Sequence, residues 1–259
     1  MGRKNLMINI YSEKEIEELL ESGKILSLVL RAVAKMVKPG VTTKELDVAA
    51  EKQIRAAGGA PAFLNYHEGN MKPYPASLCT SINDELVHCV PYVNRKIKEC
   101  DIVSLDLGVK YKNMNTDTAL TVAVGEVSKE VVQMLKVTEQ SLQKGIEAVK
   151  PGNTVGDIGH AVESFVKEYK FGIIRDLVGH GVGKNVHEEP RVPNYGKAGT
   201  GVALKPGMVI AIEPMLTLGG EKIKLLPDGF GITTADGSLS AHFEKTVAVT
   251  DSGYKIITP

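Results

Sequence analysis

Four acidic residues stand inside or beside apolar, β-branched segments, where an ionised carboxylate would be buried. Asp106 ends the run IVSLD, and Asp117 precedes TALTVAV. Glu213 lies within VIAIEPM, and Glu244 precedes TVAV. Lone ionised carboxylates are costly in such places and are found paired or bound to metal. Any one of these acids alone is better explained as a surface residue or an ion-pair partner, so the argument depends on the set.

Four acids near one axis would repel one another unless cations neutralise them, and two divalent ions would do so. A neighbouring histidine would complete the set, and His180 lies in LVGHGVG, where flanking glycines allow close backbone approach. Carboxylates with a single histidine suit borderline or hard divalent ions, so Co, Mn, Fe and Zn are all candidates. Two such ions about 3.5–4 Å apart lower the pKa of a water between them. A pair of metal ions that activates a water in this way is typical of hydrolytic enzymes.

An internal repeat indicates how the acids are brought together. The segments VKPGVTTKELD, 37–47, and VKPGNTVGDIG, 149–159, both place Pro-Gly after a helix-like stretch, which is a stop signal. In each, a threonine follows the glycine by two residues and an acid follows the threonine by three. This pattern is a capping box, so a new helix should begin after Thr42 and after Thr154.

The repeat continues through the segments that carry the acids. Three further pairs occur in the same order in both halves: 88–91 with 187–190, 97–106 with 204–213, and 121–124 with 246–249. The pair ending in Asp106 and Glu213 predicts, in each half, a turn and an alternating strand that ends in a carboxylate. We infer a single domain over 1–259, α+β in class, whose duplicated halves, about 12–125 and 126–250, pack around a pseudo-twofold axis.

Helices should cover the outer faces of this unit. The box Ser12-x-x-Glu15 predicts a helix over 12–37, and a second is expected over 129–149.

Composition and charge exclude several classes of protein. The 31 basic and 31 acidic residues balance, which argues against binding nucleic acid through its phosphates. Three cysteines at no metal-ligand spacing indicate reduced thiols and a cytoplasmic location. No long apolar stretch follows residues 1–6, so we expect no signal peptide and no membrane span.

The segments that carry these residues resemble the type I methionine aminopeptidases of the pita-bread fold. The resemblance runs from about residue 12 to the C-terminus, and five segments carry it: SINDELVHCVP (81–91), IVSLDLGVKYKNMNTDTA (102–119), GHGVGKNVHEEP (179–190), MVIAIEPM (208–215) and SLSAHFEKTVAVT (238–250). It implies a curved antiparallel sheet covered by helices. It also implies removal of the initiator methionine from nascent proteins whose second residue is small.

The resemblance assigns the metal ligands position by position. Asp117 and Glu244 correspond to the ligands that bridge two divalent ions. Asp106 corresponds to a ligand of one ion, and His180 and Glu213 to ligands of the other.

The resemblance also implies three catalytic roles. Glu213 would take the proton of the attacking water and pass it toward the leaving amine. His88 would contact the substrate's amide nitrogen, and His187 would stabilise the developing oxyanion.

A pocket for the methionine side chain is implied at six positions: Phe63, Tyr66, Tyr74, Cys79, Val186 and Phe230. Some family members carry Cys at the position of Phe63, Phe at that of Val186 and Trp at that of Phe230. The segment HEGNMKP, 67–73, is a few residues longer than usual. Taken singly, each aromatic residue among the six pocket positions is better explained as an ordinary core residue.

Further partners follow from the resemblance. Family members can hold a monovalent cation through backbone oxygens, in a region that corresponds to Asn83, Glu85 and Ser240. The expected partners are the N-termini of nascent polypeptides and the ribosome. The chain is expected to act as a cytoplasmic monomer without direct nucleic-acid specificity.

Other functions fit parts of the pattern. A related pita-bread enzyme could cleave before proline or act on dipeptides, but those enzymes usually carry an extra N-terminal domain. A non-catalytic, peptide-binding relative would usually lack some ligands, whereas all five are present here with both histidines. A purely structural metal site does not account for so many carboxylates, or for two further histidines that are not needed as ligands.

Overall fold

The computed structural model describes residues 8–259, so the expectation about residues 1–6 lies outside the described range. The helices of this range are α1 Glu13–Ala34, α2 Thr43–Ala56, α3 Lys129–Glu147 and α4 Val155–Val166, with a 3-10 turn at Lys167–Tyr169. None of these described helices is long and apolar enough to span a membrane.

The helices begin where the capping signals predict. The side chains of Ser12, Thr42 and Thr154 accept from the backbone N–H three residues on, and the acid there bonds back to the cap residue's own N–H. Ser128 caps α3 with a single bond of the same kind. Each cap satisfies N–H groups that would otherwise lack a partner, which typically stabilises a helix by about 1 kcal/mol.

Every strand pair in the described range is antiparallel. The strands are β1 Ala60–Pro61, β2 Leu78–Ile82, β3 Glu85–Val87, β4 Ile102–Tyr111, β5 Met114–Ala123, β6 Gly172–Ile173, β7 Gly179–Gly181, β8 Glu188–Val192, β9 Val209–Ile212, β10 Met215–Thr217, β11 Ile223–Leu225, β12 Ile232–Thr234, β13 Ser240–His242, β14 Lys245–Thr250 and β15 Gly253–Ile256. In the first half β1, β2 and β5 all pair with β4, and in the second the order is β15-β14-β9-β7-β8.

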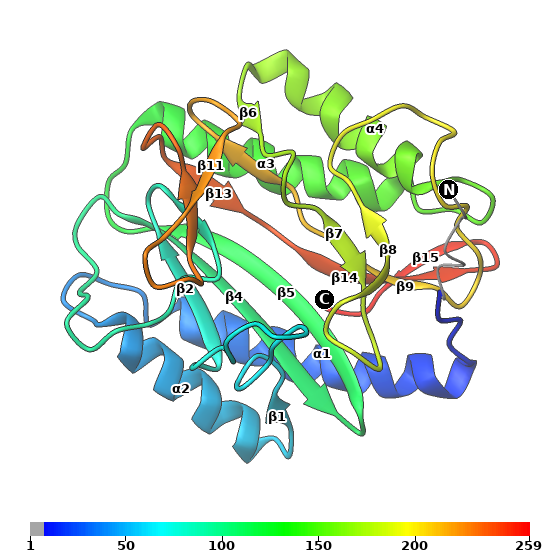
Figure 1. Ribbon diagram of the computed structural model, residues 1–259, viewed down its shortest axis with the longest axis horizontal. Coiled ribbons are helices and arrows are strands. Elements are labelled where there is room, and N and C mark those ends of the chain that lie inside the picture. The colour runs from blue at the N-terminus through cyan, green and yellow to red at the C-terminus, as the bar shows by residue number, and fades with distance from the viewer. Residues whose placement is uncertain (1–7) are drawn as a thin grey trace.

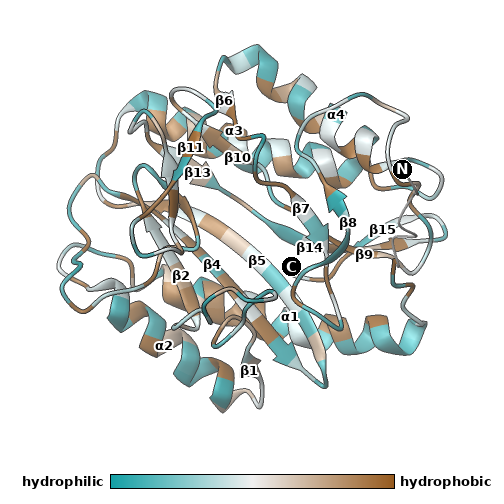
Figure 2. Cartoon of the chain, viewed as in Figure 1, coloured by the Kyte–Doolittle hydropathy of each residue, from teal (hydrophilic) through white to brown (hydrophobic). Residues whose placement is uncertain are grey.

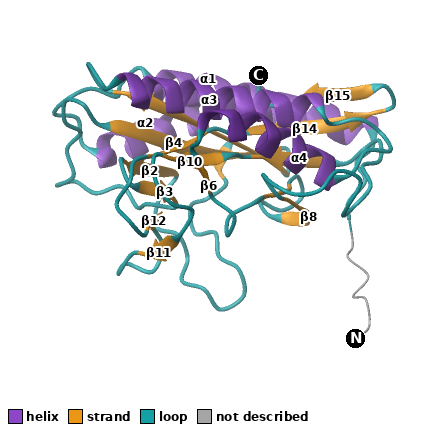
Figure 3. Cartoon of the chain, turned by 90° about the horizontal axis from the view of Figure 1, so that it is seen from above, coloured by secondary structure: helices purple, strands orange, loops and turns teal. Residues whose placement is uncertain are grey.

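The helices gather on one side of the strands, and β8, β11, β12 and long loops lie on the other (Figure 3). Figure 1 shows α1 and α2 beside the strands of the first half and α3 and α4 beside those of the second. The helices are banded in hydrophilic and hydrophobic residues, as amphipathic helices are (Figure 2). The expected antiparallel sheet covered by helices is confirmed.

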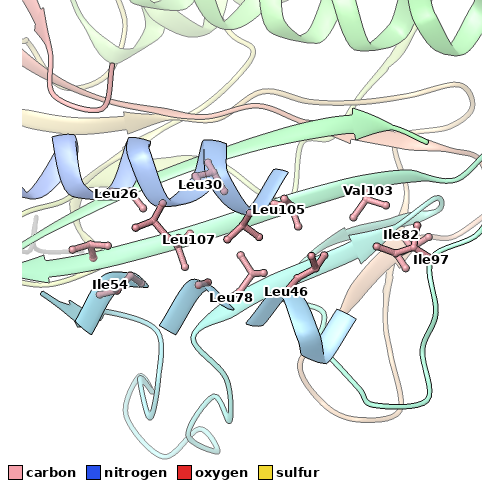
Figure 4. Packing of buried hydrophobic residues seen from close by; sticks show 14 of the residues in the cluster. Leu26, Leu30, Leu46, Ile54, Leu78, Ile82, Ile97, Val103, Leu105 and Leu107 are labelled. Carbon is pink, nitrogen blue, oxygen red and sulfur yellow. The ribbon is translucent and has the colours of Figure 1, made fainter. Parts of the chain in front are cut away.

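The largest core cluster fixes which way β4 faces. Leu26 and Leu30 of α1 and Leu46 of α2 pack with Leu105 and Leu107 of β4, all fully or almost fully buried (Figure 4). Fully burying each such side chain stabilises the fold by roughly 1.5–3 kcal/mol. Because successive side chains of a strand point to opposite faces, the residue between the last two points away from the helices.

The prediction that a strand ends at Asp106 is wrong, although it holds for Glu213, which directly follows β9. Lys112 and Asn113 adopt φ of 49° and 65°. Two consecutive positive φ values make the tight turn that favours a long hairpin. β4 therefore pairs with β5 far beyond the acid, as far as Tyr111.

The repeated segments make equivalent hydrogen bonds. The N–H of Gly40 donates to the oxygen of Ile97 at 2.9 Å, and the N–H of Gly152 donates to that of Leu204 at 3.0 Å. In each half an isolated antiparallel bridge also joins the threonine that caps the following helix to the residue just before this acceptor. These matched contacts support the proposal that one domain consists of two duplicated halves.

Candidate active site

The two halves meet where β5 crosses the chain that enters β14. The Thr118 hydroxyl donates to the backbone oxygen of Glu244 at 2.6 Å, and the Glu244 N–H donates to that of Ala119 at 2.9 Å. The Thr246 hydroxyl donates to the backbone oxygen of Asp117 at 2.7 Å. These bonds hold Asp117 and Glu244 together, although they come from different halves of the chain.

The register of the long hairpin brings the first two acids onto one face. Asp117 lies opposite Gly108, which is two residues after Asp106 on β4. Side chains two residues apart on a strand share a face, and so do cross-strand partners. Asp106 and Asp117 are therefore diagonal neighbours, on the face turned away from Leu105 and Leu107.

The second half places its two acids in an equivalent way. Lys245 of β14 pairs with Ile212 of β9. Glu244 and Glu213 are the next residues in this register, one before β14 and one after β9. Both therefore lie at the same end of the β9–β14 pair, close to the crossing of β5.

His180 on β7 points its ring at the acids. Its Nε2 lies 3.6 Å from Oε1 of Glu213 and 4.0 Å from Oδ2 of Asp117. Its Nδ1 lies 2.9 Å from the backbone oxygen of the next residue, so Nδ1–H donates there and the Nε2 lone pair faces the acids. A Cβ at Gly179 would collide with the backbone oxygen of Ala211, so this glycine allows β7 to pack against β9.

The acids are buried to an extent that ionised carboxylates alone do not tolerate. Their exposed fractions are 2–8%. Asp106 Oδ1, Asp117 Oδ1 and Glu244 Oε1 have no hydrogen-bond partner among the described residues. Burial raises the pKa of Asp106 to about 7. Burial and repulsion between the acids raise the pKa values of the other three well above their usual range.

This donor set fits divalent cations. One ligand atom from each of Asp117, His180 and Glu244 lies within 4.8 Å of the others, so one ion can contact all three. Asp106 and Glu213 line the same cavity, which measures about 830 Å³. Burial lowers the pKa of His180 to about 3, so the imidazole is neutral, as a metal ligand must be. Carboxylate oxygens with one neutral imidazole suit Mn, Fe, Co or Zn.

The two predicted substrate histidines line this cavity as well. His88 follows β3 and has an exposed side chain. His187 precedes β8, and its ring meets that of His180 edge-on with centroids 4.4 Å apart. Nδ1 of His187 lies 2.7 Å from Oε1 of Glu68 and 3.1 Å from the hydroxyl of Tyr66. The structure therefore brings both histidines to the candidate metal ligands.

The predicted methionine pocket forms one apolar cluster beside the acids. Five of its members line the cavity: Phe63, Tyr66, Tyr74, Cys79 and Phe230. Val186 is buried in the same cluster but stays outside the cavity lining that the described residues form. The rings of Tyr74 and Phe230 meet edge-on at 5.6 Å. A Cβ at Gly108 would collide with the ring of Phe63, so the pocket abuts β4 directly.

Asn83, Glu85 and Ser240 also lie together. The backbone N–H of Ser240 donates to the oxygen of Asn83 at 2.9 Å, and its hydroxyl donates to the oxygen of Glu85 at 3.0 Å. Backbone oxygens therefore converge here, each already accepting a bond from Ser240. The monovalent-cation site stays a prediction.

His242 is a candidate site residue, beside the acids, that the sequence analysis missed. It is 2% exposed, and its Nε2 lies 3.6 Å from Oε2 of Glu213. Neither ring nitrogen has a hydrogen-bond partner among the described residues. It ends β13, two residues before Glu244, which directly precedes β14. That spacing is the signal that could have identified it.

The sequence and structure of this chain match known proteins over almost their full length. Residues 17–251 match metallopeptidase family M24. A methionine aminopeptidase of Clostridium acetobutylicum is 43% identical over 252 residues, which cover 97% of this chain and 99% of the relative. The structure of a methionine aminopeptidase from Thermotoga maritima matches with a TM-score of 0.92 at 39% identity, over 97% of this chain and 99% of that one.

A second group of structures matches less completely. The prolidase from Pyrococcus furiosus has a TM-score of 0.72 at 26% identity, and the match covers 96% of this chain but 65% of the prolidase. The fold is shared by both groups, whereas the length and the sequence agree better with the first. The chain therefore belongs to metallopeptidase family M24 and has its pita-bread fold, with the methionine aminopeptidases as its nearer relatives.

Proposed function

We propose that this chain is a methionine aminopeptidase, which removes the initiator methionine from polypeptides whose second residue is small. The observation that carries the proposal is the ring of four buried acids and His180 in one cavity, directly beside an apolar cluster of suitable character for a methionine side chain. The full-length similarity to methionine aminopeptidases supports the same activity.

We propose two divalent ions, held by the five residues of the resemblance. The resemblance gives Asp117 and Glu244 as the ligands that both ions would share, and the contact between their segments at the crossing supports this assignment. Asp106 would hold one ion from β4, and His180 with Glu213 the other, in line with their 3.6 Å separation. When bound, the ions supply Lewis-acid activation of the water and the scissile carbonyl.

The chain's own residues would divide the remaining work. Glu213 would take the proton of the attacking water and move it toward the leaving amine. His88 would contact the amide nitrogen, and His187 would stabilise the negative charge that develops on the carbonyl oxygen. The apolar cluster would bind the methionine side chain and exclude water from it.

The cellular setting is part of the same proposal. We propose that the chain acts as a cytoplasmic monomer on the N-termini of nascent polypeptides, at or near the ribosome. Its 31 basic and 31 acidic residues balance, which argues against direct recognition of nucleic acid.

A peptide assay tests the activity. Metal-loaded protein should release methionine from Met-Ala-Ser, cut Met-Lys-Ser much more slowly, and leave Ala-Pro intact. Asp251→Asn, a change at an exposed turn residue, should behave as wild type and control for preparation. Cleavage of Ala-Pro with Met-Ala-Ser left intact would favour an X-Pro peptidase instead.

Replacing His187 with Ala should lower kcat by about 10²–10³, the usual cost of losing a positioned oxyanion donor. Metal content, measured by inductively coupled plasma mass spectrometry, should stay near two ions per chain. His160→Ala, at an exposed position on α4, is the matched control and should change neither quantity. Loss of metal from the His187 variant would contradict the role given to this histidine.

A further inference from the structure

The segment 67–73 forms a closed loop at the edge of the cavity. At its base the N–H of Tyr74 donates to the oxygen of Tyr66 at 2.8 Å, and the N–H of Asn65 donates to that of Tyr74 at 2.8 Å. The loop contributes Glu68 to the cavity lining. The side chain of Glu68 is 57% exposed, so it is held by its hydrogen bonds rather than by burial.

Two side chains meet at this carboxylate. The Tyr66 hydroxyl donates to Oε1 of Glu68 at 2.9 Å, and Nδ1 of His187 lies 2.7 Å from the same oxygen. The bonds from His187 and Tyr66 lower the pKa of Glu68, so it is a carboxylate at neutral pH and can only accept.

This arrangement decides which nitrogen of His187 carries the proton. The hydroxyl hydrogen of Tyr66 is already directed to Glu68, so it does not also serve Nδ1 of the ring. An unprotonated Nδ1 would face an anionic oxygen with its own lone pair, which is repulsive. Nδ1 therefore carries the hydrogen, and Nε2 is the nitrogen left for the substrate.

We propose that Glu68 is a positioning residue that holds the ring of His187 by accepting from its Nδ1–H, and so directs its Nε2 to the substrate. In the neutral ring Nε2 has only a lone pair, so the contact with the oxyanion belongs to the doubly protonated ring. In that form Nδ1–H keeps its bond to Glu68, the ring keeps the same orientation, and Nε2–H donates to the oxyanion. The proposal rests on the proposed function, because it gives His187 the substrate contact described above.

Nuclear magnetic resonance of metal-free protein labelled with ¹⁵N-histidine tests the positioning without any catalysis. At a pH of about 8.5 wild type should show Nδ1–H at His187. Glu68→Ala frees the Tyr66 hydroxyl to donate to Nδ1, 3.1 Å away, so the proton should move to Nε2. Glu68→Gln keeps an acceptor oxygen and should keep the Nδ1–H form.

A double-mutant cycle tests the consequence for the reaction. Glu68→Ala should lower kcat/KM on Met-Ala-Ser about tenfold, the order of what a supporting carboxylate contributes through a histidine. Glu68→Gln should restore most of this loss. In the His187→Ala background Glu68→Ala should have no further effect, because the residue it positions is gone.

Asn70→Ala, an exposed change in the same loop, is the control and should match wild type in both measurements. The proposal is overturned if Glu68→Ala keeps the Nδ1–H form, or if it costs the same activity with and without His187. If wild type cleaves no methionyl peptide, the proposed function fails, and the tautomer measurement alone still decides whether Glu68 positions the ring.

Discussion

Asp117→Asn is expected to remove metal and aminopeptidase activity together. Asp117 is the acid that joins the two halves, since its backbone is bonded to Thr246 and its side chain offers a ligand atom within 4.8 Å of those of His180 and Glu244. An amide is a poorer ligand than a carboxylate and cannot carry its charge. Metal affinity and activity should fall by more than the roughly 10–100-fold that removing a hydrogen-bond partner of a metal ligand costs. Metal content by mass spectrometry and Met-Ala-Ser hydrolysis measure the two effects.

The same variant should be more stable than wild type when both are metal-free. Burial and the charges of Glu244 and Asp106 raise the pKa of Asp117, which means that its ionised form destabilises the metal-free fold. The neutral amide removes that penalty. Metal-free Asp117→Asn should therefore melt at a higher temperature, whereas Asp251→Asn should melt as wild type. Full activity in Asp117→Asn would disprove the dinuclear proposal, and a lower melting temperature would contradict the electrostatic argument.

Local signals predicted the framework of this fold well. The capping boxes at Ser12, Thr42 and Thr154 form as expected because each depends on residues only three positions apart. The internal repeat identified Asp106 and Glu213 as equivalent, and the two acids do line one cavity. Short-range chemistry and repetition are visible in a single sequence.

Contacts between distant segments could not be predicted in the same way. The end of the strand that carries Asp106 was placed too early, because a tight turn that begins six residues later decides where β4 stops. Glu68 carries no signal, since a lone acid in a polar segment resembles any solvated loop. Its meeting with His187 depends on the tertiary structure that brings residues 119 positions apart together.

Removing the metal should make the stability of this protein fall as pH rises from about 7 to about 8.5. In the unfolded chain Asp and Glu are fully ionised in this range, because their pKa values lie near 3.9 and 4.3. In the folded chain the pKa values of Asp117, Glu213 and Glu244 are raised well above the usual range, whereas that of Asp106 is about 7 and adds only at the lower end of this pH range. The folded state therefore binds more protons than the unfolded state, so stability decreases with increasing pH. Burial lowers the pKa values of His180 and His242 to about 3, so these two rings beside the acids stay neutral in the folded chain and do not offset the slope.

Divalent metal should reverse this dependence, because it binds the deprotonated ligands and removes the repulsion between them. At a thousandfold excess over Kd it should stabilise the fold by about 4 kcal/mol. Each kcal/mol moves the Tm of a chain near this length by about 2–4 °C. Calorimetry of chelator-treated protein with and without Mn²⁺ should therefore show a larger gain in Tm at pH 8.5 than at pH 7. An equal gain at both pH values, or metal-free stability that rises with pH, would show that the buried acids are not the metal site.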